Sequence, residues 1–126
     1  MVRGLRSRSA RSLLALCATA TATAVLTSGC GTQDSYGLAK QACVYVNTSI
    51  SQWDSSVKKG TSTSLKKHLQ SEAYDNLQLA LQPAALAAGD NGQWQALMTT
   101  ISESSRVPEN VLIPALTDQC GVADSK

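Results

Sequence analysis

Apolar residues recur every three or four positions through most of the chain after residue 35, a spacing that predicts α-helices. The first such stretch covers residues 36 to 58. Its apolar positions follow one another at spacings of 4, 3, 4, 3 and 4: Ala39, Cys43, Val46, Ile50, Trp53 and Val57. Because these positions form one stripe on a helix, we expect a single helix that buries this face. Gly60 is a typical residue just after the end of a helix, so we expect this helix to end there.

A second helix is expected to begin at a capping serine or threonine among residues 62–64 and to reach about Gln82. Its apolar positions are Leu65, Leu69, Ala73, Leu77, Leu79, Ala80 and Leu81. They cover an arc of roughly 200° at ~100° per residue, which is typical of a central helix that touches two neighbours. Pro83 is expected to end or kink this helix, with residues 84–88 adding one further turn before Gly89.

A third helix is expected from a cap at Asp90 or Asn91 to about Ser104. Its apolar positions lie at i, i+3, i+4 and i+7: Trp94, Leu97, Met98 and Ile101. The fourth segment is predicted as a short turn over 108–112 and then a helix from about Pro114 to Cys120.

Gly121 is expected to stop that last helix and to leave residues 123–126 as a frayed tail. No stretch shows a convincing strand pattern. The fold class predicted is therefore all-α, a small antiparallel bundle of four helical segments over residues 36–122.

The first 29 residues have the pattern of a secretory signal peptide. Four arginines precede an uncharged run over residues 12–27 that ends in small residues. This run of about 16 residues is shorter than the ~20 that a helix needs to span a bilayer. A cleaved signal is therefore expected, and an uncleaved membrane anchor is the alternative.

The signal ends in Leu26-Thr27-Ser28-Gly29-Cys30, which resembles the lipobox of bacterial prolipoproteins. The family prefers Leu where Thr27 stands, and a cut after Ala24 by an ordinary signal peptidase is the alternative. The resemblance implies that Cys30 carries a diacylglycerol and becomes the mature N-terminus, with residues 30–35 as a lipidated tether. Two acyl chains on one residue hold a protein stably at a membrane. The expected location is the outer face of the bacterial cell membrane, outside the cytoplasm.

Two cysteines remain for a disulfide, because Cys17 leaves with the signal and Cys30 takes the lipid. An even pair in an oxidising compartment predicts a bond between Cys43 and Cys120, with two buried free thiols as the alternative. Such a bond is expected to stabilise the domain by roughly 4 kcal/mol. The residues after the signal hold seven basic and nine acidic side chains, and this balance gives no reason to expect nucleic-acid binding.

Candidate catalytic groups are few. His68 is the one histidine, and Glu72 lies one helical turn further on. A zinc site needs three or four ligands, and no second histidine is present to join His68. The sequence also has neither the Gly-x-Ser-x-Gly elbow of serine hydrolases nor a glycine-rich phosphate loop. We therefore expect a protein that is not an enzyme and uses no metal or cofactor, with His68 on a solvated helix face.

A candidate partner surface and two aromatic residues are candidates for binding. The partner surface has two parts, a lysine-rich turn with Lys58, Lys59, Lys66 and Lys67, and an apolar edge with Leu79, Leu81 and Leu86. Trp53 and Trp94 are candidates for lining a ligand pocket, although their apolar stripes favour core packing. The first helix should carry the lysines some 34 Å from the tether, at 1.5 Å per residue.

Residues 93–100, together with Val107-Pro108-Glu109, resemble small lipoproteins of high-GC Gram-positive bacteria that have no assigned activity. This resemblance implies no functional residue. The function favoured by the sequence is a tethered, non-enzymatic protein that binds an envelope partner. The alternative is an accessory protein that holds a small ligand beside Trp53 or Trp94.

Overall fold

The computed structural model describes residues 34–125, and this part of the chain is helical without a strand. The helices are α1 (Ser35–Ser56), α2 (Thr63–Asp90), the 3-10 helix η1 (Gly92–Trp94), α3 (Gln95–Ser102) and α4 (Glu109–Asp124). The predicted all-α bundle of four helical segments is confirmed. The expected signal, lipobox and Cys30 lie outside the described residues.

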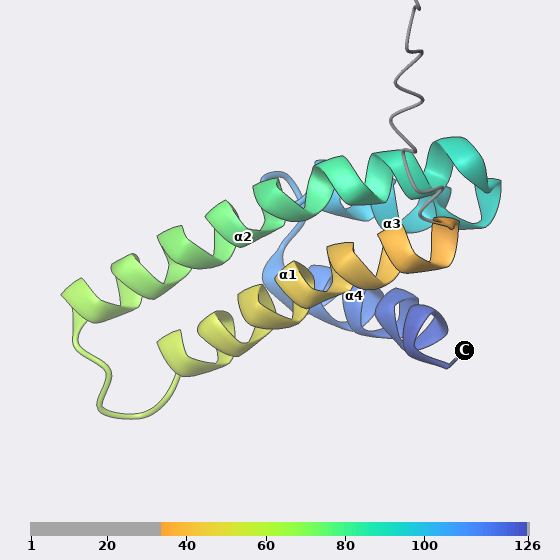
Figure 1. Cartoon of the computed structure of the whole chain (residues 1–126). Helices are drawn as coiled ribbons and strands as arrows, with labels where there is room; N and C mark the ends of the chain where they lie inside the picture. Colours follow the sequence, from red (N-terminus) through yellow and green to blue (C-terminus); the bar gives the residue numbers. More distant parts are fainter. Residues whose placement is uncertain (1–33, 126) are drawn as a thin grey trace, which may run out of the picture.

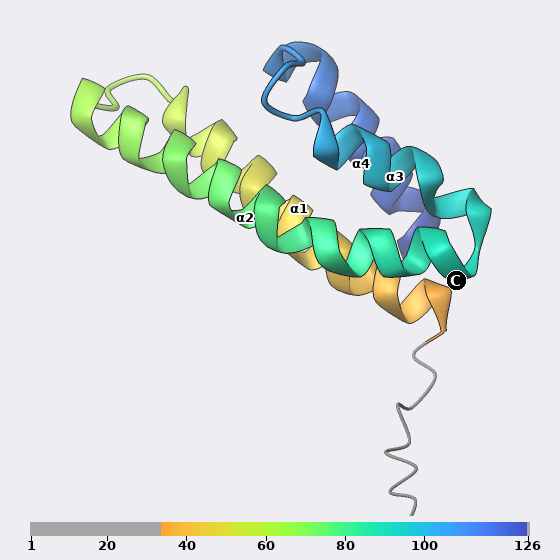
Figure 2. The same ribbon diagram turned by 90° about the horizontal axis from the view of Figure 1, so that it is seen from above.

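Helices α1 and α2 form a long antiparallel hairpin, and α3 and α4 cover one side of only half of it (Figures 1 and 2). The covered half contains the start of α1 and the end of α2. The main cluster of buried core residues accordingly lies between Ala39 and Val46 on α1 and between Leu77 and Ala88 on α2, while Trp53 and Ala73 are buried outside this cluster. The connecting end of the hairpin projects beyond α3 and α4, and the chain enters at the opposite end.

Side-chain caps set the starts of α1, α2 and the third helical segment, and the sequence predicts the last two of these caps. Asp34 caps α1 by accepting a hydrogen bond from the amide of Gly37 at 2.6 Å, and Ser62 caps α2 by accepting from Leu65 at 3.2 Å. Asn91 caps the third segment, whose first turn is the 3-10 helix. Between α1 and α2 the chain reverses through Gly60, whose φ of 92° is readily adopted only by glycine.

The predicted end of the second helix near Gln82 is wrong, because α2 continues through Pro83 to Asp90. A proline inside a helix removes one hydrogen bond and costs ~3 kcal/mol. Burial of the following turns against the core offsets this cost. The buried positions there are Pro83, Ala84, Ala87 and Ala88.

The predicted turn before Pro114 and the stop at Gly121 are also wrong. Helix α4 is continuous from Glu109 to Asp124 and contains both residues. Its buried positions, Leu112, Leu116, Cys120 and Ala123, form one stripe that spans both breaker residues. Ala123 is fully buried, so the segment expected to fray packs against the core instead.

The disulfide between Cys43 and Cys120 is present and joins α1 to α4, with 5.5 Å between the Cα atoms. Around it the hairpin is packed largely through small side chains, since Ala39, Ala42, Ala80, Ala84 and Ala87 are all fully buried. Small residues let two helices approach closely. Trp94, Leu97, Ile101, Leu112 and Leu116 fill the space beneath α3 and α4.

None of the helices in residues 34–125 is both long enough and apolar enough to cross a membrane.

Candidate functional site

The connecting end of the hairpin forms a basic tip, defined here as residues 55–71. It holds Lys58, Lys59, Lys66 and Lys67, which we call the tip lysines, and no acidic residue. All four are exposed, and none forms an ion pair with another described residue. The rest of the described chain carries nine acidic residues and two basic ones, Lys40 and Arg106. The projecting end of the hairpin is therefore basic, with Asp54 and Glu72 as the acidic residues that flank it along the chain.

The tip also exposes apolar side chains that the sequence pattern places on the buried stripe. Val57 is 63% exposed and Leu65 is 48% exposed. The expectation that these two positions face the core is wrong, because α3 and α4 end before reaching them (Figure 2). Deeper in the hairpin Trp53 is covered by Tyr74 in an edge-to-face contact, with 5.1 Å between ring centroids. Within residues 34–125, the tip thus combines lysines that form no ion pair with exposed apolar side chains.

The second part of the candidate partner surface lies on the outer side of α2. Leu79 and Leu86, seven residues apart and on one face, are 57% and 55% exposed. A shallow pocket of about 180 Å³ beside Leu86 is lined by Leu38, Gln41, Gln82, Pro83 and Leu86. Leu81 does not belong to this surface, since it is partly buried and packs against the core. The structure therefore divides the predicted surface into the basic tip and the Leu79–Leu86 face.

The two tryptophans differ in their surroundings, although both are buried. Trp94 lines a pocket of about 200 Å³ together with Gln93, Ala96, Leu97, Gln119 and Val122. Trp53 lines neither this pocket nor the one beside Leu86. Of the two tryptophans, Trp94 is thus the one that lines a pocket described here. The volume of this pocket is below the ~300 Å³ usual for drug-sized ligands.

Gln119 is a member of this pocket that the sequence analysis does not single out. It precedes Cys120 on α4, and its side-chain amide donates to the hydroxyl of Thr100 on α3 at 3.0 Å. Its carbonyl oxygen Oε1 is buried without a hydrogen-bond partner among residues 34–125, and so is the indole Nε1 of Trp94. The sequence does not show that a polar residue such as Gln119, on an amphipathic helix, lies beside a pocket. Its place becomes visible only when α4 packs against α3.

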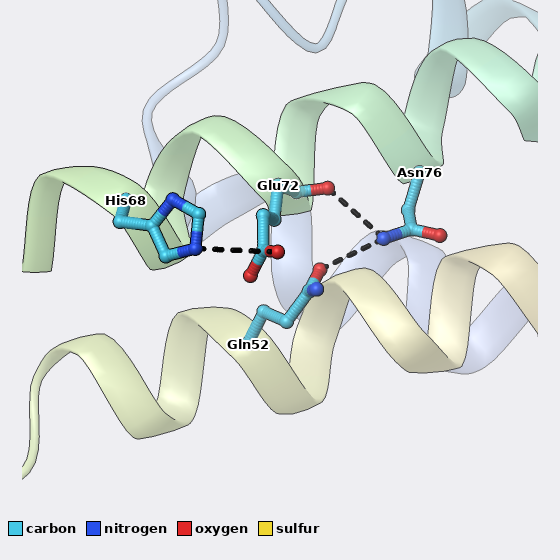
Figure 3. Close-up of polar contacts among 4 residues, drawn as sticks. All are labelled: Gln52, His68, Glu72 and Asn76. Carbon is cyan, nitrogen blue, oxygen red and sulfur yellow. Dashed lines mark hydrogen bonds and ion pairs between the residues drawn. The ribbon is translucent and has the colours of Figure 1, made fainter. Parts of the chain in front are cut away.

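His68 takes part in a short polar chain along the hairpin (Figure 3). Its Nε2 lies 3.4 Å from Glu72 Oε1, the contact expected for residues one helical turn apart. Asn76 Nδ2 donates to Gln52 Oε1 on α1 and to the backbone carbonyl of Glu72, both at 2.9 Å. His68 and Glu72 are both substantially exposed. The bond from Asn76 to Gln52 joins α1 to α2, whereas the contact between His68 and Glu72 lies within α2.

A metal site has no support in residues 34–125, where no three His, Cys, Asp or Glu side chains are grouped to hold an ion. Comparison of the chain with protein-family models, curated proteins and solved structures found no match. The residues and geometry of this chain are therefore the basis for its proposed function.

Proposed function

We propose that this chain is an extracytoplasmic lipoprotein, held at the outer face of a bacterial membrane through Cys30, that binds an acidic partner protein with its basic hairpin tip. The observation that carries this proposal is the concentration of basic residues at one end of the hairpin. Four of the six lysines and arginines in residues 34–125 gather on a projecting end, where none forms an ion pair with another described residue. The function is binding, and it requires no catalytic group.

The disulfide supports a location outside the cytoplasm. Disulfides persist in oxidising compartments and are rare in the cytosol. The bond between Cys43 and Cys120 is formed with ordinary separation of its Cα atoms. This agrees with the signal and lipobox pattern of residues 1–30, which supplies the argument for export and lipidation.

Distance favours a partner over the lipid surface to which the chain is tethered. Helix α1 has 22 residues and is therefore about 33 Å long, at 1.5 Å per residue. The Debye length at physiological salt is about 8 Å, so charges at one end of α1 are screened from charges at the other. With the tether at the start of α1, a hairpin that stands perpendicular to the membrane holds the tip lysines several Debye lengths away from the lipid headgroups.

The composition of the tip suits a protein partner. Exposed lysines attract an acidic surface and speed its encounter with the tip, while exposed apolar side chains add area that a partner can bury. Val57 and Leu65 supply that area within the basic stretch. The tip therefore combines electrostatic attraction with a small apolar contact.

Photo-crosslinking in intact cells tests the proposal directly. A benzophenone amino acid at Leu65 should capture one protein reproducibly, and that protein should present an acidic surface. Val111 on α4, an apolar residue 55% exposed, is the matched control position and should capture little. Equal capture of the same proteins from both positions would contradict a partner site at the tip.

Binding to lipid is the competing outcome, and it can be measured separately. Residues 30–126 carrying Cys30→Ala, the expected mature chain without its lipid, should not float with vesicles of anionic phospholipid in physiological salt. Flotation that disappears when the tip lysines are changed to glutamine would identify the membrane as the target of the tip and overturn the proposal of a protein partner.

A further inference from the structure

The connection between α1 and α2 is exposed and weakly held. It consists of residues 57–62, called the tip loop here, and none of them is buried. The amides of Lys59 and Gly60 form no hydrogen bond with another described residue, and the bond from the Lys58 amide is long, at 3.4 Å. The loop also lies beyond α3 and α4 (Figures 1 and 2). Segments with so few contacts open at low cost, and exposed loop tips are preferred sites of proteolytic cleavage.

The residues of the tip loop match the specificity of one class of endoprotease. Trypsin-type enzymes bind a basic side chain on the residue before the bond that they cut. Lys58 and Lys59 are exposed and lie outside a helix, and Gly60 follows them. Lys40, Lys66 and Lys67 are also exposed, but each lies inside a helix, where the backbone cannot extend along a protease cleft without unwinding.

Arg106 is the remaining basic residue outside a helix in residues 34–125, and its loop is held more firmly. The amides of Arg106 and Val107 both donate to the carbonyl of Glu103, at 2.8 and 3.1 Å. Ser104 is buried, and Val107 packs against the core. Opening this loop therefore removes core contacts, whereas no residue of the tip loop belongs to the core or packs against it.

The position of the disulfide determines what a cut in the tip loop produces. Cys43 lies before the loop and Cys120 lies after it, so their bond joins the two pieces. Helix α1 also keeps its buried contacts, because Ala39, Ala42 and Val46 lie in the covered half of the hairpin, away from the cut. A chain cut in the tip loop is therefore expected to stay folded and in one assembly.

We infer that the tip loop is a proteolytic processing site, where a trypsin-type endoprotease outside the cytoplasm cuts after Lys58 or Lys59 and leaves two folded, disulfide-linked pieces. One water molecule is consumed. The peptide C–N bond breaks, the lysine before the cut gains a carboxylate, and the residue after the cut gains an ammonium group. The carboxylate follows the end of α1 and the ammonium group precedes α2. Both charges oppose the helix dipoles at these ends, so the cut loosens the last turn of α1 and the first turn of α2.

The consequence for the basic tip rests on the proposed function. Cutting places the tip lysines on two separate loosened ends, so they no longer form one charged surface, and the acidic partner is released. Cleavage itself requires no partner. It is therefore measured on the chain alone, and its failure is distinguishable from the failure of the partner site.

Limited digestion with trypsin tests the site. The full-length chain is treated in nonionic detergent, and mass spectrometry should find Lys59 or Gly60 as the first new N-terminus within residues 34–125. Electrophoresis should show the two pieces as one band without reductant and as two bands with it. A first cut after Arg106 or inside a helix, or separation of the pieces without reductant, would overturn the inference.

Two double variants separate the tip loop from the rest of the basic tip. Lys58→Gln with Lys59→Gln should slow the first cut about tenfold or more, because the remaining sites need a costlier opening of the chain. Lys66→Gln with Lys67→Gln removes two lysines of the same tip from inside α2, and it should leave the rate within about twofold. Equal slowing by both pairs would contradict a site in the loop.

Cells that make the chain provide the last measurement. Their membrane fraction should contain the two-piece form of the unmodified chain and only the intact form of the Lys58→Gln and Lys59→Gln variant. Both proteins should be compared with and without reductant, since the disulfide hides the cut. Finding the intact form alone for the unmodified chain would overturn its processing at this site.

Discussion

Cys43 on α1 and Cys120 on α4 are joined by a disulfide that closes 77 residues of chain. Both lie on the apolar stripes of their helices and are almost fully buried. The bond therefore holds the last helix against the first from within the core. It also fixes the end of α4 on which Gln119 lies, next to the bond.

Removing the disulfide is expected to destabilise the domain strongly. A loop of this length corresponds to about 4 kcal/mol in the chain-entropy model, a large part of the stability of a small domain. The double variant Cys43→Ala and Cys120→Ala should lower the free energy of unfolding in urea by that order. Reductant should bring the unmodified chain to the level of the variant and leave the variant unchanged. Insensitivity of the unmodified chain to reductant would contradict the prediction.

Leu77 and Leu79 lie two residues apart on α2 but in opposite environments. Leu77 is fully buried in the core, while Leu79 faces outward. Leu77→Ala should cost about 2–5 kcal/mol of stability, because it leaves a cavity. Leu79→Ala should change stability by less than about 0.5 kcal/mol. Urea denaturation compares the two, and similar losses would show that the outer face of α2 is covered.

Much of the fold is readable from the sequence because its signals are local. The stripe from Ala39 to Trp53 predicts α1, and Ser62 and Asn91 predict the starts of the next two segments. The predicted bond between Cys43 and Cys120, the two cysteines left after the signal and the lipobox, is confirmed. The helices and their caps depend on helical spacing and on hydrogen bonds within one turn, which a sequence displays directly.

The errors arise where tertiary packing overrides a local rule. Pro83, Pro114 and Gly121 are helix breakers by propensity, yet each lies inside a helix whose buried stripe continues past it. The opposite error occurs at Val57 and Leu65, where the stripe continues but nothing covers it. Spacing predicts which residues share a face, whereas the lengths of α3 and α4 decide which part of that face is buried.

The candidate sites differ in how much the sequence reveals. The tip lysines are visible in the sequence as a cluster, whereas only the structure shows that the hairpin carries them beyond α3 and α4. Trp94 was a candidate because of its size. Gln119 was not, since its place beside Trp94 follows from the crossing of two helices far apart along the chain.

Replacing Pro114 should stabilise the protein. Its ring is exposed, so Pro114→Ala loses little packing and restores an amide N–H that can bond to the carbonyl of Asn110. After allowing for greater freedom of the unfolded chain, we expect a gain of about 1–2 kcal/mol. Pro108→Ala is the matched control, because Pro108 precedes the first turn of α4 with a φ of −59° and should give no gain. Thermal unfolding by circular dichroism measures both, and destabilisation by Pro114→Ala would contradict this account of α4.

The cap of α2 offers a second local test. Ser62 accepts the hydrogen bond of the Leu65 amide, so Ser62→Ala should cost about 1 kcal/mol. Ser64→Ala is the control within the first turn, where alanine favours the helix and the side chain is exposed. Urea denaturation should separate the two variants, and equal stabilities would argue against the cap.

The tip lysines should affect association without affecting stability. Because they are exposed and unpaired among the described residues, changing all four to glutamine should leave the unfolding temperature almost unchanged. The yield of the crosslink from Leu65 should nevertheless fall several-fold, and its dependence on salt should disappear, since both reflect attraction between opposite charges. The paired change Lys40→Gln and Arg106→Gln removes the other two described cations and should leave the yield as it was. Equal losses from both sets would mean that overall charge, rather than the projecting basic end of the hairpin, draws the partner.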